Sequence, residues 1–323
     1  MGSVLELVGL SKEFPGHTAV DDVSLEIPRG AFYSLLGPSG CGKTTTLRLI
    51  AGFEQPTRGE VRLNGICIDH LRPYERNVST VFQNYALFPH LTVRQNIEFG
   101  LRQRHAEQRE RRVREAIAMV QLAGKEERYP SEISGGEKQR AALARSLVLE
   151  PEVLLLDEPL AALDPSLRKQ MRTELKELQR RVGISFLFVT HDQEEALALS
   201  DRIAVMRQGR IEQVGTPEEV YLRPRTRFVA GFLGAMNWID GAGIRPEATR
   251  ISRTEPPDSA RARAATVADS VFLGNCLHVE AQIASGPRVV AETARVDGGF
   301  ARGEQVHVWW HAADELRFPD EPA

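Results

Sequence analysis

Short apolar runs alternate with longer helix-forming stretches over most of the chain. Three such runs are FYSLL at 32–36, EVLLLD at 152–157 and ISFLFV at 184–189. The helical segments that follow them begin at Lys43, Pro165 and Asp192. A strand repeatedly followed by a helix indicates a largely parallel sheet that is covered by helices. The pattern therefore predicts an α/β domain.

Two other regions of this domain have a different pattern. Near the start, VLELVGLS (4–11) and AVDDVSLEI (19–27) alternate more strongly, which predicts exposed strands in an antiparallel appendage. Residues 84–150 are mostly helical in pattern and predict a helical subdomain. Its Arg-rich stretch, 101–120, is interpreted as the solvated surface of an amphipathic helix rather than as a binding patch.

The character of the chain changes after residue 235. Residues 243–265 are rich in Arg, Pro and Ala. Short alternating segments follow and predict strands: TVADSVFLG at 266–274, CLHVEAQI at 276–283, PRVVAETA at 287–294 and QVHVWWH at 305–311. We therefore expect two domains, an α/β domain over 1–235 and a small all-β, barrel-like domain over 236–323.

Composition narrows the possible environments and partners. The formal net charge of −3 gives no global basic field that would collect nucleic acid or anionic lipid. Apolar runs such as VLLL at 153–156 are far shorter than the roughly 18 residues of a spanning helix, and the N-terminus lacks a secretory pattern. Cys41, Cys67 and Cys276 are widely separated and show no metal-type pairing, which favours reduced thiols in a cytoplasm. Any membrane role is expected to be peripheral.

A phosphate-binding loop follows the first apolar run. The sequence GPSGCGKT, Gly37 to Thr44, matches the GxxxxGK[ST] pattern between a strand and a helix. Lys43 is expected to reach the β- and γ-phosphates and the Thr44 hydroxyl to ligate Mg²⁺. A redox role for Cys41 is a minor alternative. Nine residues form the candidate phosphate cradle: Gly37, Pro38, Ser39, Gly40, Cys41, Gly42, Lys43, Thr44 and Thr45.

Two further strand ends carry candidate catalytic groups. In VLLLDEP, Asp157 can hold Mg²⁺ directly or through water, and Glu158 can polarise a water for attack on the γ-phosphate. A purely structural carboxylate pair is the alternative. His191 follows the strand ending in FVT, where a contact with the γ-phosphate and a structural role are equally compatible with the spacing.

The order and spacing of the motifs resemble the ATP-binding subunits of ABC transporters over residues 4–235, and the region from GIRPEA (243–248) onward resembles the TOBE domain of importer ATPases. The resemblance implies a P-loop NTPase fold with antiparallel and helical subdomains, followed by the small β domain. The first β-domain strand is expected to be shortened or altered. The motifs that carry the cassette resemblance are GPSGCGKTT (37–45), VFQ (81–83), ISGGEKQR (133–140), VLLLDEP (153–159), AALD (161–164) and VTHD (189–192).

The resemblance also implies roles that the spacing alone does not. Phe14 would stack on adenine, unless it only packs in the core; Gln83 would sense Mg²⁺ and the γ-phosphate; Glu158 would be the general base with His191 as its partner. Two copies would pair head to tail, so that each chain offers Asp164 and its signature helix to the ATP of the other. The signature residues are Ser134, Gly135 and Gly136.

Position 137 departs from the family pattern, which usually has Gln there. Ser134 and Glu137 fit an S-x-x-E capping box, and we expect Glu137 to fold back as a cap. The alternative is a carboxylate that faces the phosphate and weakens closure.

The resemblance implies an ATPase that drives import through integral membrane permease subunits, at the cytoplasmic face of the plasma membrane, and indirectly serves a solute-binding protein. Leu87, Phe88 and Pro89 are the expected permease contacts. Residues 75–93 most resemble polyamine (spermidine/putrescine) importers, with ferric iron, phosphonate and sugar importers as alternatives. A soluble ABC ATPase acting on nucleic acid or the ribosome is disfavoured, because the chain has one phosphate loop and no sustained heptad run. A ligand sensor with a vestigial ATPase conflicts with the intact motifs.

Overall fold

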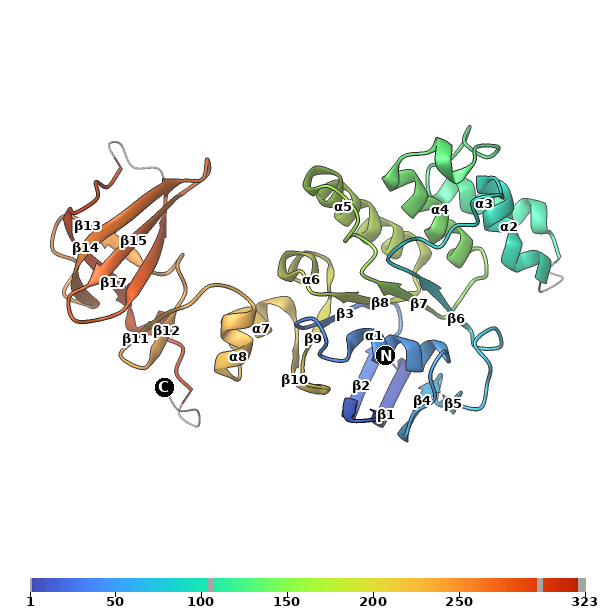
Figure 1. Cartoon of the computed structure of the whole chain (residues 1–323), viewed down its shortest axis with the longest axis horizontal. Coiled ribbons are helices and arrows are strands. Elements are labelled where there is room, and N and C mark those ends of the chain that lie inside the picture. The colour runs from blue at the N-terminus through green and yellow to red at the C-terminus, as the bar shows by residue number, and fades with distance from the viewer. Residues whose placement is uncertain (1, 104–106, 295–298, 319–323) are drawn as a thin grey trace. The chain divides into compact units, whose positions relative to one another are not determined.

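The computed structural model describes residues 2–103, 107–294 and 299–318, which form two compact units divided between Glu218 and Glu219 (Figure 1). Helix α7 (Pro217–Leu222) spans this division, and α8 (Arg227–Phe232) lies in the second unit. The sequence pattern placed the change after residue 235. The helices join the second unit because the buried Arg245 donates hydrogen bonds to the carbonyls of Tyr221 and Ala230.

A six-stranded sheet forms the centre of the first unit, in the order β10-β9-β3-β8-β7-β6. The five strands other than β10 are parallel, as the alternation of strands and helices predicted, and β10 pairs antiparallel with β9. The strands are β3 (Phe32–Leu36), β6 (Val78–Val81), β7 (Val153–Asp157), β8 (Ser185–Thr190), β9 (Arg202–Arg207) and β10 (Arg210–Gly215).

Alternate residues of the central strands face two different cores. In β7, Leu154 and Leu156 pack into one core with the helices α2 to α5, whereas Val153 and Leu155 pack into another with α1 and the antiparallel sheet. All four side chains are fully buried. A strand that is buried on both faces reads as a continuous apolar run, which is why these strands were easily found in the sequence.

The predicted antiparallel appendage is a four-stranded sheet, in the order β2-β1-β4-β5. Its long first hairpin pairs Leu5 with Ile27 and ends where Phe14 pairs with His17. Helix α1 (Lys43–Ala51) packs in the core that this sheet shares with the central one. The four strands are β1 (Ser3–Phe14), β2 (His17–Pro28), β4 (Arg58–Leu63) and β5 (Ile66–Cys67).

Helices cover the other face of the central sheet. The Arg-rich stretch falls on two helices, α2 and α3, rather than on one, and residues 104–106 within it lie outside the described residues. The helices are α2 (Val93–Gln103), α3 (Arg109–Met119), the 3₁₀ turn η1 (Pro130–Glu132), α4 (Gly135–Leu147), α5 (Pro165–Val182) and α6 (Gln193–Leu199).

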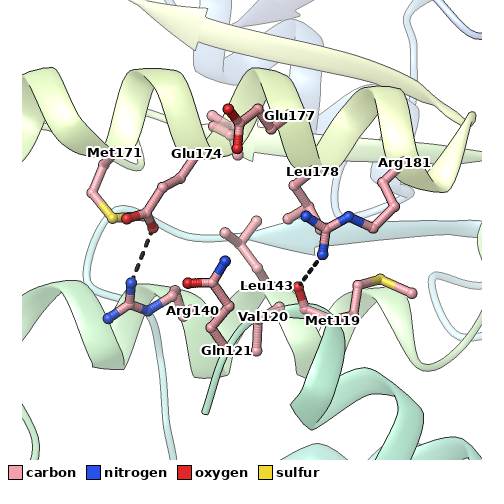
Figure 2. A pocket seen from close by; sticks show the side chains of 11 residues that line it. Met119, Val120, Gln121, Arg140, Leu143, Met171, Glu174, Glu177, Leu178 and Arg181 are labelled. Atoms are coloured by element: carbon pink, nitrogen blue, oxygen red, sulfur yellow. Dashed lines mark hydrogen bonds and ion pairs between the residues drawn. The ribbon is translucent and has the colours of Figure 1, made fainter.

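The helical subdomain is attached to α5 by polar contacts around a small apolar gap, which Figure 2 shows. Arg140 of α4 donates a hydrogen bond of 3.0 Å to Glu174 of α5. Arg181 of α5 donates one of 3.1 Å to the Met119 carbonyl at the end of α3. These contacts fix the signature helix α4 relative to α5.

The second unit is a five-stranded antiparallel sheet, in the order β13-β17-β14-β15-β16, with a short hairpin of β11 and β12. Its core includes the fully buried Val308 and the nearly buried Trp310. Strand β14 begins earlier than the apolar pattern predicted, because Arg261 and Arg263 take exposed positions along it. The elements are β11 (Asn237–Ile239), β12 (Ala242–Ile244), β13 (Arg250–Ser252), β14 (Ala260–Phe272), β15 (Leu277–Ile283), β16 (Arg288–Thr293), β17 (Gln305–His311) and the 3₁₀ turn η2 (Ala312–Asp314).

Across the described ranges, we find no helix with the length and apolar character needed to cross a bilayer.

Candidate functional site

The predicted chemical groups of the first unit gather at one edge of the central sheet. Gly37 follows β3, Asp157 ends β7, His191 follows β8 and Gln83 follows β6. These strands are parallel, so their carboxyl ends lie at the same edge. Ligands of open α/β sheets bind at this edge.

The phosphate loop is closed by its own lysine. Lys43 is 5% exposed, and its Nζ donates hydrogen bonds of 2.7 Å to the Gly37 carbonyl and 2.9 Å to the Pro38 carbonyl. A Cβ on Gly37 would lie 2.2 Å from the Met206 carbonyl oxygen, and Gly42 has a φ of 106°. The glycines are therefore required by close backbone approach and by a left-handed conformation.

Cys41 is not suited to a redox role. The residue is 4% exposed, and burial raises the pKa of its thiol although Lys43 lies nearby and opposes the shift. A reactive cysteine requires an accessible thiolate. The Cys41 sulfur packs against Gly37 across the loop, so Cys41 contributes to the packing of the loop.

Thr44 and Asp157 meet across the two halves of the site. The Thr44 hydroxyl donates a hydrogen bond of 3.2 Å to Asp157 Oδ1. Burial raises the pKa of Asp157; the Thr44 hydrogen bond opposes this shift, and the neighbouring Glu158 adds to it. A hydroxyl beside a carboxylate whose charge is poorly solvated is a donor set that fits a hard cation such as Mg²⁺.

Glu158 and His191 form a second polar pair. His191 Nδ1 lies 3.1 Å from Glu158 Oε1, and the Glu158 backbone N–H donates to the Val189 carbonyl at 3.0 Å. Glu158 has a φ of 45°, which is uncommon for a residue other than glycine. Residues held in such conformations cluster at functional sites. The hydrogen bond to β8 holds Glu158 in this position.

A cavity of about 500 Å³ lies in front of the phosphate loop. Glu158 lines it together with six residues of the predicted cradle: Ser39, Gly40, Gly42, Lys43, Thr44 and Thr45. Five lining residues were missed from the sequence because they lie at two hairpins with no recognisable motif. They are His17, Thr18 and Ala19 at the start of β2, and Gln208 and Gly209 in the turn between β9 and β10.

Phe14 and Gln83 lie outside the lining of this cavity. Phe14 is half-buried and stacks on His17, with ring centroids 5.5 Å apart, while Lys12 Nζ lies 4.9 Å from the Phe14 ring centre. Phe14 thus reaches the cavity wall only through His17. Gln83 is exposed in the loop after β6.

The capping box predicted for the signature helix is present. Ser134 Oγ accepts a hydrogen bond of 3.3 Å from the Glu137 backbone N–H, and Glu137 Oε2 accepts one of 2.7 Å from the Ser134 N–H. The Ser134 N–H lowers the pKa of Glu137, and Lys125, 3.4 Å away, contributes further. Glu137 therefore folds back onto the start of its own helix.

The residues expected to act across two chains do not line the cavity in front of the phosphate loop. Ser134, Gly135, Gly136 and Asp164 are absent from the cavity lining, although all four lie in the described part of the chain. Asp164 is exposed and caps α5, accepting hydrogen bonds from the N–H groups of Ser166 and Leu167 at 3.1 and 3.0 Å.

A larger, mainly apolar groove of about 890 Å³ lies beside β6. Phe88 lines it and packs on Phe99 with ring centroids 4.5 Å apart. Of the other expected permease contacts, Leu87 packs against the helical core and Pro89 is exposed; neither lines the groove.

The phosphate loop, the carboxylate pair and the cavity between them define the class of protein as a P-loop ATPase with a separate C-terminal β unit. Residues 20–161 match the family model described as ABC transporter, and residues 242–318 match the TOBE domain. The chain belongs to the family of ABC transporter ATP-binding proteins and is an ATPase that binds ATP.

Two relatives of known name extend over nearly the whole chain. The spermidine/putrescine import ATP-binding protein PotA of Rubrobacter xylanophilus is 48% identical over 95% of this chain and 92% of its own length. The protein of the same name from Bacillus cereus is 45% identical over 98% of this chain and 99% of its own.

Solved structures match the cassette part. CbiO1 of Clostridium perfringens, described as part of the ABC transporter complex cbiONQ, has a TM-score of 0.64 at 29% identity, over 68% of this chain and 91% of its own. The ATP-binding cassette MJ0796, solved as a dimer with ADP and Pi, has a TM-score of 0.58 at 31% identity, over 66% of this chain and 98% of its own.

Proposed function

We propose that this chain is the energy-coupling ATPase of a polyamine importer, acting on spermidine or putrescine through separate membrane subunits. The observation that carries the proposal is the 45–48% identity to spermidine/putrescine import ATP-binding proteins across both units. The resemblance of residues 75–93 to polyamine importers points to the same substrate class.

The residues of the cavity can bind and hydrolyse ATP in the following way. Loop N–H groups and the start of α1 would hold the phosphates, with Lys43 turning from the Gly37 and Pro38 carbonyls to the β- and γ-phosphates. Glu158 would accept the proton of a water that attacks the γ-phosphate, while His191 orients Glu158 and contacts the same phosphate.

Thr44, Asp157 and Gln83 are the residues that would hold Mg²⁺. When bound, the ion would neutralise charge that develops on the phosphate oxygens. Thr44 and Asp157 are already within hydrogen-bond distance, and a bound cation would oppose the burial that raises the pKa of Asp157, as Arg48 and Lys43 already do in part.

A second copy would complete each ATP site. The signature residues Ser134, Gly135 and Gly136 begin α4 with a helix N-terminus, which attracts phosphate. In a head-to-tail homodimer they would face the γ-phosphate held by the other chain, with Asp164 across the interface and Phe14 beside the adenine. One similar solved structure, the cassette MJ0796, is dimeric, which supports the proposal of a homodimer.

The groove beside β6 would receive an integral permease subunit. Phe88 and Phe99 give it an aromatic wall, and Arg145 joins its lining. A cytoplasmic helix of the permease would fit as an amphipathic helix in a groove. The ATPase would then sit at the cytoplasmic face of the plasma membrane as a peripheral subunit, and the solute-binding protein would act on it only through the permease.

Reconstitution with the cognate permease and solute-binding protein tests the function. We expect spermidine or putrescine to stimulate ATP hydrolysis several-fold, because ligand binding would favour the closed arrangement of the subunits. Replacing Phe88 by Ala should reduce co-purification with the permease, because Phe88 forms part of the aromatic wall of the groove. Stimulation by ferric iron, a phosphonate or a sugar, and none by polyamines, would contradict the proposed substrate.

A further inference from the structure

A cysteine, a histidine and a glutamate meet on the second unit, far along the chain from the phosphate loop. Cys276 lies in the turn between β14 and β15, and His278 follows it two positions later in β15. Glu292 lies in β16, directly opposite His278 in the antiparallel register. Cross-strand partners of an antiparallel pair lie on the same face of the sheet, and the Cys276 sulfur lies close to both side chains.

The distances within this cluster suit a metal ion. His278 Nε2 and Glu292 Oε2 are 3.4 Å apart, and the three ligand atoms all lie within 4.8 Å of one another. Zinc bonds of about 2.0–2.2 Å to nitrogen and oxygen at tetrahedral angles separate two such ligands by about 3.3–3.5 Å. The His278 and Glu292 atoms already have this spacing, and only the Cys276 sulfur must move closer.

The three residues of the cluster differ in their exposure to solvent. Cys276 is 8% exposed, whereas the side chains of His278 and Glu292 are each 38% exposed. An ion can therefore enter from solvent and keep a water as its fourth ligand, while the sulfur stays sheltered. Zinc uses three protein ligands and a water in this way at its open sites.

A purely structural reading explains part of this cluster. His278 and Glu292 could be an ordinary cross-strand pair, and Cys276 an apolar filler. However, the core face of β15 is occupied by Leu277, Val279 and their alternate neighbours, and Cys276, which precedes the strand, is not part of that core cluster. The sheltered thiol therefore lies beside polar ligands rather than among the core side chains.

We propose that Cys276, His278 and Glu292 form a Zn²⁺ site on the second unit. Thiolate, imidazole and carboxylate are a donor set that zinc prefers among common divalent ions. Thiolate and carboxylate together balance the two charges of the ion. On binding, the Cys276 thiol loses its proton to solvent and a sulfur–zinc bond forms, with no change of oxidation state.

The protonation of the free site agrees with this exchange. Burial raises the pKa of the Cys276 thiol, and a hydrogen bond with Glu292 raises it further. Metal affinity should increase with pH for the same reason.

Cobalt titration of the full-length, chelator-treated protein tests the site, because Co²⁺ bound to a thiolate has a charge-transfer absorption in the near ultraviolet. We expect one equivalent of Co²⁺ to produce this absorption and Zn²⁺ to abolish it by displacement. Cys276→Ser should remove the absorption, and His278→Ala should weaken Co²⁺ binding at least about tenfold, since even indirect partners of metal ligands have effects of that size.

Cys67→Ser is the matched control, because Cys67 also lies near a carboxylate, Asp69, but has no histidine in its cluster. This variant should keep the full absorption. Absence of a thiolate band in the wild-type protein, or its survival in Cys276→Ser, would overturn the proposal. If Cys276→Ser folds poorly, Glu292→Gln gives the same test: binding weakened at least about tenfold supports the site, and unchanged binding contradicts it. These outcomes do not depend on ATP hydrolysis or on the transported solute.

Discussion

At the scale of single residues, the ionised form of Asp157 is disfavoured by its surroundings in the folded protein, and its proposed role in holding Mg²⁺ explains why a carboxylate is placed there. Burial raises the pKa of this carboxyl, and Glu158 beside it adds to the shift. The folded protein thus holds a proton on Asp157 more tightly than the unfolded chain does. Stability attributed to this group is present below its unfolded pKa of about 4 and is lost as the pH rises through its folded pKa. At neutral pH the ionised Asp157 therefore destabilises the nucleotide-free fold.

Asp157→Asn should accordingly raise the melting temperature of the nucleotide-free protein at neutral pH while it abolishes Mg²⁺-dependent ATP hydrolysis. The gain should shrink as the pH falls towards 4, because Asp157 then becomes neutral in the wild-type protein too. Differential scanning calorimetry over a pH series measures it. Asp164→Asn is the control with the opposite sign: the Leu167 N–H lowers the pKa of Asp164, so its replacement should not stabilise the protein.

The positions of Lys43, Asp157 and Glu158 at one edge of the sheet could be predicted from the sequence, because each belongs to a local motif between a strand and a helix; their roles stay predictions. His17 and Gln208 could not, because two hairpin turns bring them to the cavity only after folding. The zinc site was missed for a related reason. Cys276 and His278 are close in sequence, but Glu292 joins them through strand register.

At the scale of elements, Ser134 caps α4 and Asp164 caps α5, so each residue has a structural role within one chain that needs no ligand. Ser134 and Glu137 satisfy each other's N–H groups, and Asp164 caps the helix that Pro165 begins. The cap of α4 was predicted from the sequence, because a capping box depends on two residues three positions apart. The cap that Asp164 makes on α5 was not predicted. The same residues remain proposed contacts of a second chain, so one side chain can serve both the helix and the dimer.

Glu137→Gln should change ATPase activity by less than about twofold, since Gln caps a helix in the same way. The lost ion pair with the half-exposed Lys125 is worth about 0–1 kcal/mol. Steady-state hydrolysis measures the first effect. Glu137→Ala, which removes the reciprocal cap, should lower the free energy of unfolding by about 1 kcal/mol. A large gain of activity in Glu137→Gln would mean that the carboxylate turns towards ATP in the working enzyme.

Other features of the elements could not be predicted. Arg76 is fully buried and donates to the Leu49 and Ile50 carbonyls at 2.7 and 2.8 Å, at the end of α1. In sequence it is one charged residue among several before β6. Only the packed structure shows that its guanidinium satisfies the last carbonyls of the helix that begins at the phosphate loop.

At the scale of the whole molecule, each chain has a phosphate loop and a set of signature residues, and the proposed ATP site combines the phosphate loop of one chain with the signature residues of the other. Glu158→Gln should retain ATP, hydrolyse it at least about 100-fold more slowly, and accumulate as an ATP-dependent dimer in size-exclusion chromatography. Hydrolysis stops because Gln cannot accept the proton of water. Lys43→Ala is the control, because loss of phosphate binding should leave it monomeric. Wild-type hydrolysis by Glu158→Gln would show that another group is the base.

The strands, the helices and the order of the two units were largely predictable from the sequence. The residue at which one unit ends and the next begins differs from the expected one, and this difference has a physical cause. Periodicity predicts which segments are strands or helices, and motif order places them in a known family. The division between the units fell elsewhere than the composition suggested because one buried side chain, Arg245, ties α7 and α8 to the β unit. Composition is a poor guide to such single long-range contacts.

The two-sided burial of β7 has a consequence for how this strand is aligned. If β7 slipped by one residue, the places of Leu154 and Leu155 would still receive apolar side chains of similar size. One end of the strand, however, would bury a carboxylate: Asp157 in the place of Leu156, or Glu152 in the place of Val153. The first of these slips would also put Glu158 where Asp157 now meets Thr44. The carboxylates at the two ends of the strand therefore fix an alignment that its apolar middle leaves open.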